Sequence, residues 1–307
     1  MPLVSSKPIL EEALRSHFAV GAFNANNMEQ IQAIVEAAQE ERAPVVLQVS
    51  QGAIRYAGLD FATGMVKIAA SLVDIPVVLH LDHGTDFDQN VRCLRAGFTS
   101  LMYDGSKRPF EENVATTKRI AEIAHIVGIP VEAELGQVLR VTDKVTYEQV
   151  CAAMTNPAQA REFIERTGAD SLAVACGSVH GMTAREASLN IDLLKEIHAA
   201  IPNTPLVLHG SSGVKHESVV EGLAYGICKV NVATALNEAL IAGMRRAAAE
   251  LPDETDPRQI IGPGREAVKE VVREKIRLFR SAGVIDSTGG FVSGKRQFRS
   301  AQLGEVE

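Results

Sequence analysis

The stretch Val78-Leu79-His80-Leu81-Asp82-His83-Gly84 is the segment from which the fold can be inferred. A run of apolar residues ends abruptly in a carboxylate, an imidazole and a glycine. Buried strands of a parallel α/β barrel deliver catalytic side chains to the barrel mouth at their carboxyl ends in this way. The same pattern recurs along the chain, so we interpret this segment as one strand of a repeated strand–helix unit.

Eight apolar segments alternate with helical patterns. The predicted strands cover residues 19–23, 44–49, 77–81, 100–103, 130–134, 171–176, 205–208 and 227–230. The predicted helices cover residues 28–42, 61–72, 86–95, 110–127, 157–166, 191–199, 216–225, 234–250 and 257–280. This alternation predicts an α/β protein with a single (β/α)₈ TIM barrel over residues 1–285 and an extra C-terminal helix. Two doubly wound domains are the alternative, but Phe23-Asn24-Ala25-Asn26 is not the glycine-rich turn that they would carry after a first strand.

The last part of the chain, residues 286–307, changes character. Ser287-Thr288-Gly289-Gly290 and Ser293-Gly294-Lys295-Arg296 are typical of turns and show no hydrophobic periodicity. We expect this tail to be exposed or packed on a neighbouring subunit.

Composition excludes several classes of function. Hydrophobic residues make up 46% of the chain and charged residues 22%, which indicates an ordinary globular core. The net charge of −7 argues against an extended nucleic-acid site. No apolar run is long enough to cross a membrane, and the N-terminus lacks a signal-peptide pattern. The four cysteines have no CxxC spacing, so we expect a cytoplasmic protein with reduced thiols. From the charge and the apolar runs we expect no nucleic-acid partner and no membrane partner.

Three histidines at predicted strand ends are each followed by glycine, in His83-Gly84, His180-Gly181 and His209-Gly210. The carboxyl ends of parallel barrel strands meet on one face, so these side chains should converge. Three neutral imidazoles form an open tetrahedral site for a divalent ion, most naturally Zn²⁺, with one position left for substrate. A lone histidine at a strand end is more often a hydrogen-bonded core or surface residue, and that is the interpretation for His80, which lies one layer deeper.

Glu132 and Glu134 lie two residues apart on one predicted strand, so both side chains face the barrel interior. A carboxylate there must be paired or bound to metal. Glu134 is nearer the mouth and is the predicted metal ligand or partner of a ligand. Glu132 is predicted to pair with Lys229 from the last strand. The alternative for Lys229 is a Schiff base with the substrate.

Two further segments predict a phosphate site. Gly210-Ser211-Ser212-Gly213 follows the seventh strand, and Asn231-Val232-Ala233-Thr234 follows the eighth. Backbone N–H groups and hydroxyls at this place in a barrel commonly hold a phosphate. Asn24, Ser50 and Asp104 end other strands on the same face.

On these motifs the chain resembles the class II, metal-dependent ketose-bisphosphate aldolases. The matching segments are Val20 to Asn24, Leu79 to Gly84, Val131 to Gly136, Gly177 to Gly181, Leu208 to Gly213 and Lys229 to Asn231, within a similarity from about residue 4 to about residue 285. The resemblance implies that His83, His180 and His209 hold a catalytic zinc. It implies that Glu134 ligates the metal in its resting position, that Asp104 belongs to a second cation site, and that Asp82 exchanges the proton of the substrate's C4 hydroxyl.

The resemblance also implies the substrate and the partners. The substrate would be a ketose 1,6-bisphosphate, tagatose or fructose, and the products dihydroxyacetone phosphate and glyceraldehyde 3-phosphate. Residues Gly181, Gly210, Ser212, Asn231 and Thr234 would grip the dihydroxyacetone-phosphate half. The segment Asp256-Pro257-Arg258 matches one whose arginine reaches the other phosphate from a neighbouring subunit, which implies a homodimer or homotetramer. Residues 155–163 and 226–234 look most like the tagatose branch, because fructose-bisphosphate aldolases usually carry aspartate where Ala233 stands.

One loop departs from the family pattern. The family has paired glycines and a proton-transferring glutamate after the fifth strand, whereas this chain has Leu139, Arg140 and Thr142 there, with Asp143 next to it. The hypotheses that follow are a zinc-dependent aldolase acting on a ketose bisphosphate or on another phosphorylated ketose, a Schiff-base lyase, and a metal-binding homologue that has lost turnover.

Overall fold

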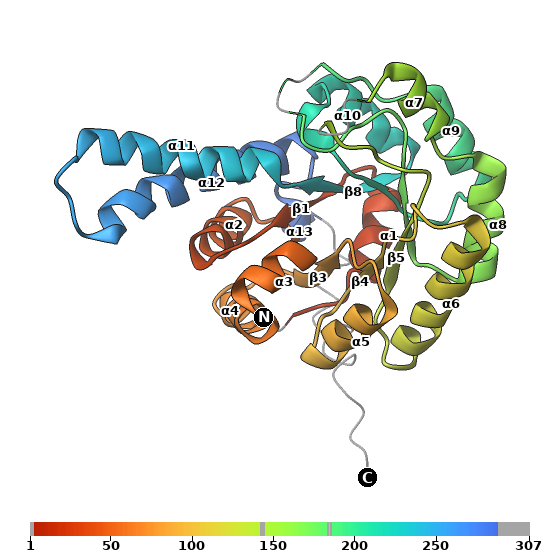
Figure 1. The fold of residues 1–307 in the computed structure, drawn as a ribbon, viewed down its shortest axis with the longest axis horizontal. Helices are drawn as coiled ribbons and strands as arrows, with labels where there is room; N and C mark the ends of the chain where they lie inside the picture. Colours follow the sequence, from red (N-terminus) through yellow and green to blue (C-terminus); the bar gives the residue numbers. More distant parts are fainter. Residues whose placement is uncertain (1–2, 142–144, 183, 185, 288–307) are drawn as a thin grey trace, which may run out of the picture.

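Eight parallel strands form the centre of the molecule in the computed structural model, which describes residues 3–141, 145–182, 184 and 186–287 (Figure 1). The strands are β1 (Val20–Asn24), β2 (Val45–Ser50), β3 (Val77–Asp82), β4 (Leu101–Tyr103), β5 (Val131–Leu135), β6 (Ser171–Val174), β7 (Leu206–Leu208) and β8 (Ile227–Val232). Their order is β3-β2-β1-β8-β7-β6-β5-β4. Bridges from His80 to Ser100 and from Gly84 to Tyr103 join β3 to β4 and close the ring. The predicted TIM barrel is confirmed.

Helices surround the strands. They are α1 (Lys7–Ser16), α2 (Met28–Glu40), α3 (Gln51–Ala57), α4 (Leu59–Ser71), α5 (Phe87–Ala96), α6 (Phe110–Ile126), α7 (Tyr147–Ala152), α8 (Pro157–Thr167), α9 (Ile191–Ala200), α10 (His216–Gly222), α11 (Thr234–Glu250), α12 (Pro257–Leu278) and α13 (Val284–Ser287). Asparagine or aspartate accepts a hydrogen bond from the first turn of five of them, α2, α5, α8, α9 and α12. These caps satisfy donors that would otherwise lack a partner, which fixes where each helix begins.

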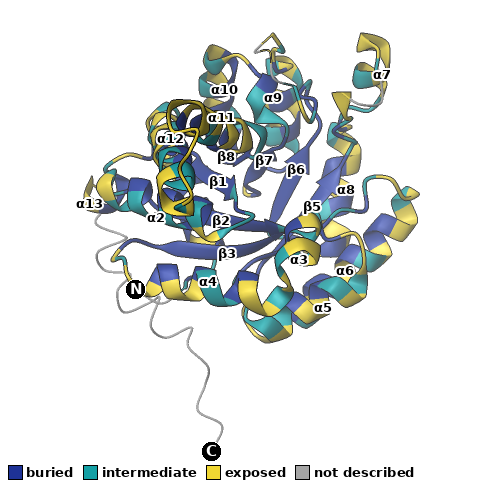
Figure 2. Ribbon diagram, turned by 60° about the vertical axis from the view of Figure 1, so that its left-hand side comes forward, coloured by how far each residue is buried: buried dark blue, intermediate teal, exposed yellow. Residues whose placement is uncertain are grey.

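The barrel strands are buried on both faces (Figure 2). Outward-facing strand residues pack against the helices in one large apolar cluster. The amino-terminal end of the barrel interior is filled by a second cluster, in which Ile9, Leu10 and Ala13 of α1 meet Val20, Val46 and Val78. Helix α1 therefore plugs that end of the barrel, and the opposite end is left for function.

Helices α11 and α12 form a hairpin that extends away from the barrel (Figure 1). Their close contact depends on glycines, because a Cβ on Gly243 would lie 2.7 Å from the Cα of Gly264. Asp256 caps α12 at the tip of this hairpin, and the neighbouring Arg258 pairs with it. No helix among the described residues is both long and apolar enough to cross a bilayer.

Four helices were not predicted from the sequence: α1, α3, α7 and α13. Helices α3, α7 and α13 have seven, six and four residues, too few for a clear hydrophobic period, and α1 has ten. Helix α13 includes residues 286 and 287, the first two of the predicted tail. The rest of that tail, residues 288–307, lies outside the described residues, as do Thr142, Asp143 and Lys144 of the divergent loop.

Candidate metal and substrate site

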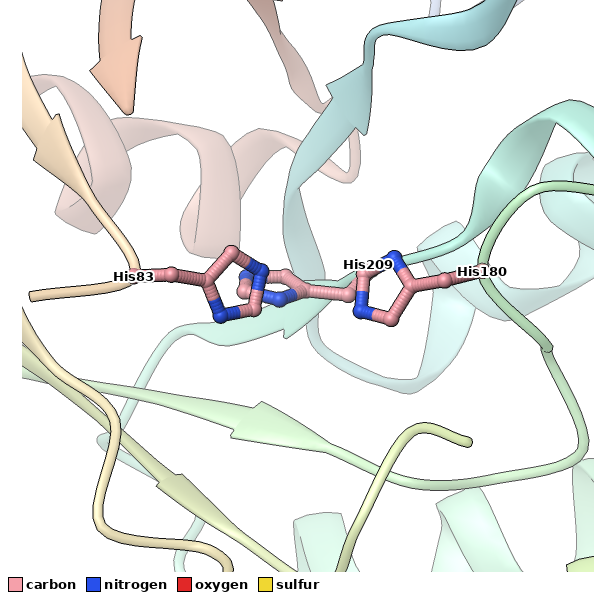
Figure 3. Close-up of side chains that lie close together, drawn as sticks. All are labelled: His83, His180 and His209. Carbon is pink, nitrogen blue, oxygen red and sulfur yellow. The ribbon is translucent and has the colours of Figure 1, made fainter. Parts of the chain in front are cut away.

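Three imidazoles that follow three different strands converge at the mouth of the barrel, with His83 and His209 directly after β3 and β7 and His180 in the loop after β6. Figure 3 shows the rings of His83, His180 and His209 pointing toward one another. The ring centroid of His83 lies 4.7 Å from that of His209 and 5.2 Å from that of His180. One nitrogen from each ring lies within 4.8 Å of one nitrogen from each of the others, an arrangement that can hold a metal ion. The predicted convergence of the three histidines is therefore seen in the structure.

The backbone at the end of β3 aims His83 into this cluster. His83 adopts a left-handed conformation with φ 49°, which a residue with a side chain rarely adopts and which is frequent at functional sites. Glycine must follow, because a Cβ on Gly84 would lie 2.5 Å from the carbonyl oxygen of Met102 on β4. The His-Gly pair therefore combines a turned imidazole with close packing of β3 against β4.

Two carboxylates complete the cluster. His83 Nδ1 lies 2.8 Å from Asp104 Oδ2 and 3.8 Å from Glu134 Oε2. A second group able to hold an ion is accordingly formed by His83, Asp104 and Glu134. Glu134 Oε2 and His209 Nδ1 are buried without a hydrogen-bond partner among the described residues, although they lie 3.5 Å apart. Buried polar atoms without partners are rare, and a divalent ion would satisfy both, so the residues fit the expected metal.

The electrostatics of the cluster leave two rings neutral. Burial and nearby positive charge, that of Arg140 included, lower the pKa of His180 to about 3, and burial lowers the pKa of His209 well below its ordinary value. Burial acts in the same direction on His83, but the surrounding carboxylates outweigh it and raise its pKa to about 9. Burial and the charge of Asp104 raise the pKa of Glu134 to about 8. Neutral imidazoles are the form that binds metal, so His83 is the one ring that has to lose a proton, and Glu134 has to lose one as well where it serves as a ligand.

Asp82 is held by two amides beside the histidines. Asn24 Nδ2 donates to Asp82 Oδ2 at 2.7 Å, and Asn231 Nδ2 donates to Asp82 Oδ1 at 3.3 Å. Burial favours the neutral acid, yet the positive charges nearby and the bond from Asn24 outweigh it and lower the pKa of Asp82. Asp82 is therefore an oriented carboxylate, ionised at neutral pH, which is what a general base requires.

A layer of charged groups lies directly beneath the metal cluster. Glu132 is 2% exposed, and its Oε2 pairs with Lys229 Nζ at 3.0 Å. Its Oε1 lies 3.0 Å from His209 Nε2. The predicted ion pair of Glu132 and Lys229 is present in the structure, and the contact with His209 was not anticipated. A partner of this kind orients a metal-ligating imidazole through its other nitrogen.

A cavity of about 940 Å³ opens above this floor. Most of the residues predicted to form the site line it, namely Asn24, Ser50, Asp82, His83, Asp104, Glu134, His180, Gly181, Gly210, Ser211, Ser212, Asn231, Ala233 and Thr234. Three do not: His209 and Val232 are fully buried, and Arg258 lies at the tip of the helical hairpin. An Arg258 acting in this cavity would have to come from another subunit, as the resemblance implies.

The predicted phosphate segments form one wall of the cavity. Ser211 donates its hydroxyl hydrogen to the carbonyl oxygen of Asn231 at 2.5 Å, which joins the ends of β7 and β8. Gly210 has φ 66°, and a Cβ there would lie 2.9 Å from the carbonyl carbon of Val179. Helix α11 begins at Thr234 with no side-chain cap, so its first N–H groups are available to an anion.

Sequence reasoning missed part of the lining. The additional residues are Gln51, Gly52, Arg55, Thr85, Ser106, Lys107, Arg108, Gln137, Val138, Leu139 and Arg140. Most of them lie one to six residues beyond a predicted strand end, in loops whose direction the sequence does not reveal. Their position immediately after the strands on the functional face was the available signal.

Comparison with known proteins identifies the family. The family model described as fructose-bisphosphate aldolase class-II matches residues 4–284. A probable fructose-bisphosphate aldolase of Bacillus subtilis (strain 168) is 45% identical over 286 residues, which cover 92% of this chain and 99% of the relative. A fructose-bisphosphate aldolase of Thermus caldophilus is 43% identical over 304 residues, with the same coverage.

Solved structures agree with this assignment. The YdjI aldolase of Escherichia coli K12 is 35% identical and superposes with a TM-score of 0.79, covering 92% of this chain and 99% of that one. A putative fructose-1,6-biphosphate aldolase of Coccidioides immitis is 30% identical, with a TM-score of 0.82 and coverage of 92% and 98%. The chain therefore belongs to the class II fructose-bisphosphate aldolase family, whose members are zinc-dependent lyases that cleave a ketose bisphosphate into two triose phosphates.

Proposed function

We propose that this chain catalyses the reversible cleavage of a ketose 1,6-bisphosphate to dihydroxyacetone phosphate and glyceraldehyde 3-phosphate, with Zn²⁺ held by His83, His180 and His209. The observation that carries the proposal is the convergence of three imidazoles beside Asp82 on the floor of a cavity. Asp104 and Glu134 provide further ligands, either for the same ion in another position or for a second cation.

The protein groups act on the substrate in a defined order. When bound, the divalent ion supplies Lewis-acid stabilisation of the negative charge that develops on the ketose oxygens. Asp82 accepts the proton of the C4 hydroxyl, and the C4–O bond becomes the carbonyl of the released aldehyde as the C3–C4 bond breaks. The electron pair of that bond stays with the dihydroxyacetone-phosphate half, which takes up a proton at C3 to become product. Asn24 and Asn231 keep the carboxylate of Asp82 aimed during this transfer.

The wall formed by β6, β7 and β8 is assigned to the phosphate of the dihydroxyacetone half. Gly181, Gly210, Ser211, Ser212 and Thr234 all line the cavity there, and they offer backbone N–H groups and hydroxyls rather than full charges. Asn231, Val232 and Ala233 connect this wall to the strand beneath it. Such a cradle orients a phosphate while leaving the reacting carbons over the metal ligands.

The competing Schiff-base hypothesis is weakened by the position of Lys229. Its side chain is 1% exposed, and its ammonium group pairs with Glu132 and donates to Asn231 Oδ1 at 2.8 Å. A nucleophilic lysine must reach the substrate carbonyl in its neutral form, and this lysine lies below the floor of the cavity.

A substrate panel tests the proposal. Zinc-loaded protein is incubated with fructose 1,6-bisphosphate, tagatose 1,6-bisphosphate and other ketose phosphates, and triose phosphate release is measured. We expect cleavage of a bisphosphate, its loss with a chelator, and its recovery with Zn²⁺ or Co²⁺. Cleavage that survives complete metal removal would contradict the metal-dependent mechanism. Tight binding of every bisphosphate without any cleavage would identify a homologue that has lost turnover.

The assembly and location are also part of the proposal. A homodimer or homotetramer would bring Arg258 of one subunit to the cavity of another, since the helical hairpin carries it away from its own barrel. Cytoplasmic location is consistent with the reduced thiols and with a triose-phosphate product.

A further inference from the structure

The rim of the cavity is cationic. Arg55, Lys107, Arg108 and Arg140 all line it, from the segments that follow β2, β4 and β5. The carboxylates that line the cavity are confined to the floor, where they surround the metal-binding histidines. The four rim cations outnumber those three carboxylates even before a divalent ion is counted, so the cavity attracts anions.

These four cations have no carboxylate partners within the described part of the chain. Some exposed arginines elsewhere pair with carboxylates, as Arg166 does with Glu111 at 2.5 Å, whereas others, such as Arg92, have no carboxylate partner among the described residues. The chain as a whole carries 38 acidic against 31 basic residues, so acidic partners are not scarce. Folding alone gives no reason for unpaired cations to gather in one cavity, whereas an anionic ligand does.

Arg140 is the rim cation whose backbone is fixed against the metal site. His180 N–H donates to the carbonyl of Leu139 at 2.8 Å, and the N–H of Val141 donates to the carbonyl of His180 at 3.0 Å. These two bonds form a parallel bridge between Arg140 and His180. Because paired backbones lie about 5 Å apart, the backbone of Arg140 is held beside His180, and its side chain extends from that fixed position.

The cavity therefore has two unlike sides. Neutral donors follow β6, β7 and β8, and the cations follow β2, β4 and β5. The metal-binding histidines follow β3, β6 and β7 and so belong to both arcs. We propose that Arg140 binds a second anionic group of the substrate, at the end of the ketose remote from the C1 phosphate, and so selects substrates that carry an anion at both ends. This inference rests on the proposed function and adds a specificity-determining residue from within the same subunit.

The chemistry of the guanidinium group sets the ligand class. Arginine binds both phosphate and carboxylate through two parallel hydrogen bonds, so the shared feature is a planar or tetrahedral oxyanion. Arg55 and Arg108 lie on the same arc and add to the field that attracts it. A neutral hydroxymethyl terminus gains nothing from these charges.

Binding of non-cleavable analogues tests the inference. Zinc-loaded protein is titrated by calorimetry with a hexitol 1,6-bisphosphate, a phosphorylated hexonate that ends in carboxylate, and a hexitol 1-phosphate that ends in a neutral hydroxyl. In Arg140→Ala we expect affinity for at least one doubly anionic ligand to fall about 10- to 100-fold, and affinity for the monophosphate to change less than threefold. The ligand with the larger loss identifies phosphate or carboxylate as the natural terminus. Arg140→Lys keeps the charge and should recover part of the loss.

The matched control is Arg92→Ala, which removes an exposed arginine of α5 that does not line the cavity. It should leave all three affinities unchanged. An equal loss on the monophosphate, or no loss on either doubly anionic ligand, overturns the inference. Cleavage assays distinguish this inference from the proposed function. If the Arg140→Ala variant is active and its substrate selectivity is unchanged, only this inference is refuted. If the wild type is inactive but still binds the doubly anionic analogues through Arg140, only the proposed function is refuted.

Discussion

Replacement of Lys229 by methionine tests the charged layer beneath the metal site. Methionine has a similar length but no charge, so the variant leaves the buried carboxylate of Glu132 without its ammonium partner. The remaining neighbours of that carboxylate are two imidazoles, with His209 Nε2 at 3.0 Å and His80 Nε2 at 3.6 Å. Asn231 Oδ1 loses its donor from Lys229 as well.

The expected cost follows from burial. Both members of the pair are at most 2% exposed, so solvent cannot replace the missing partner. Removing one member of a buried ion pair destabilises a protein by about 3–5 kcal/mol. In a domain of this size 1 kcal/mol corresponds to about 2 °C, so the midpoint of thermal unfolding should fall by about 6–10 °C.

Two control variants separate this effect from others. Lys118→Met removes an exposed lysine whose pair with Glu122 spans 3.9 Å on α6, and should change the midpoint by less than about 1 °C. Glu132→Gln combined with Lys229→Met removes both charges of this pair and should recover most of the lost stability. With Glu132→Gln alone as the other single variant, the cycle gives the coupling energy of the pair as the effect of the double variant minus the effects of the two single variants.

The assay is differential scanning calorimetry of metal-loaded and metal-free protein. Because Glu132 also contacts His209, the Glu132→Gln variant should bind Zn²⁺ about 10- to 100-fold more weakly than wild type. If Lys229→Met unfolds at the temperature of the Lys118→Met control, the reasoning from buried charge is refuted. If Lys229→Met folds normally and borohydride trapping of substrate is lost only in this variant, the Schiff-base hypothesis replaces it.

Three further predictions test other parts of the molecule. In metal-free protein the pKa of His83 is raised to about 9, so His83 is protonated at pH 7 and Zn²⁺ binding should release at least one proton. The affinity for Zn²⁺ should therefore rise with pH from 6 toward 9. Calorimetry in buffers of different ionisation enthalpy measures the proton release, and a Zn²⁺ affinity that is independent of pH contradicts the prediction. Asp82→Ala should lose about 100- to 10,000-fold in the rate of cleavage while dihydroxyacetone phosphate still binds, whereas wild-type turnover would remove Asp82 from its role. Gly243→Ala should destabilise the α11–α12 hairpin by about 1–3 kcal/mol, because the new Cβ would lie 2.7 Å from the backbone of Gly264. The control Gly64→Ala, which has open space in α4, should instead stabilise the protein by about 0.5–1 kcal/mol, and equal effects on urea unfolding would count against the packing argument.

The barrel and its metal-binding histidines were predictable because local patterns encode them. Eight β-rich apolar segments alternate with amphipathic helices, and parallel topology then forces their carboxyl ends onto one face. The proximity of His83, His180 and His209 could therefore be predicted from the barrel topology without any knowledge of long-range contacts. Glu132 and Lys229 could be paired because the period of two in a strand fixes which side chains face inward.

The features that escaped prediction depend on loop direction and on long-range packing. Helix α1 plugs the barrel through contacts with β8 and β1 and an apolar cluster that includes Val46 and Val78, which its own pattern does not specify. The contact of Glu132 with His209 joins residues 77 positions apart and depends on the depth of each strand in the barrel.

The gathering of four cations at the rim of the cavity could not be predicted from the sequence. Arg55, Lys107, Arg108 and Arg140 are scattered over 86 positions among 31 basic residues, and nothing in their local sequence separates them from arginines that pair on the surface. Lys107, Arg108 and Arg140 reach the cavity from loops and Arg55 from helix α3, and none of the four has a carboxylate partner in the described structure. The replacement of the family's loop glycine by Arg140 was visible in the sequence as a departure, and only its bridge to His180 turns that departure into a testable determinant of substrate choice.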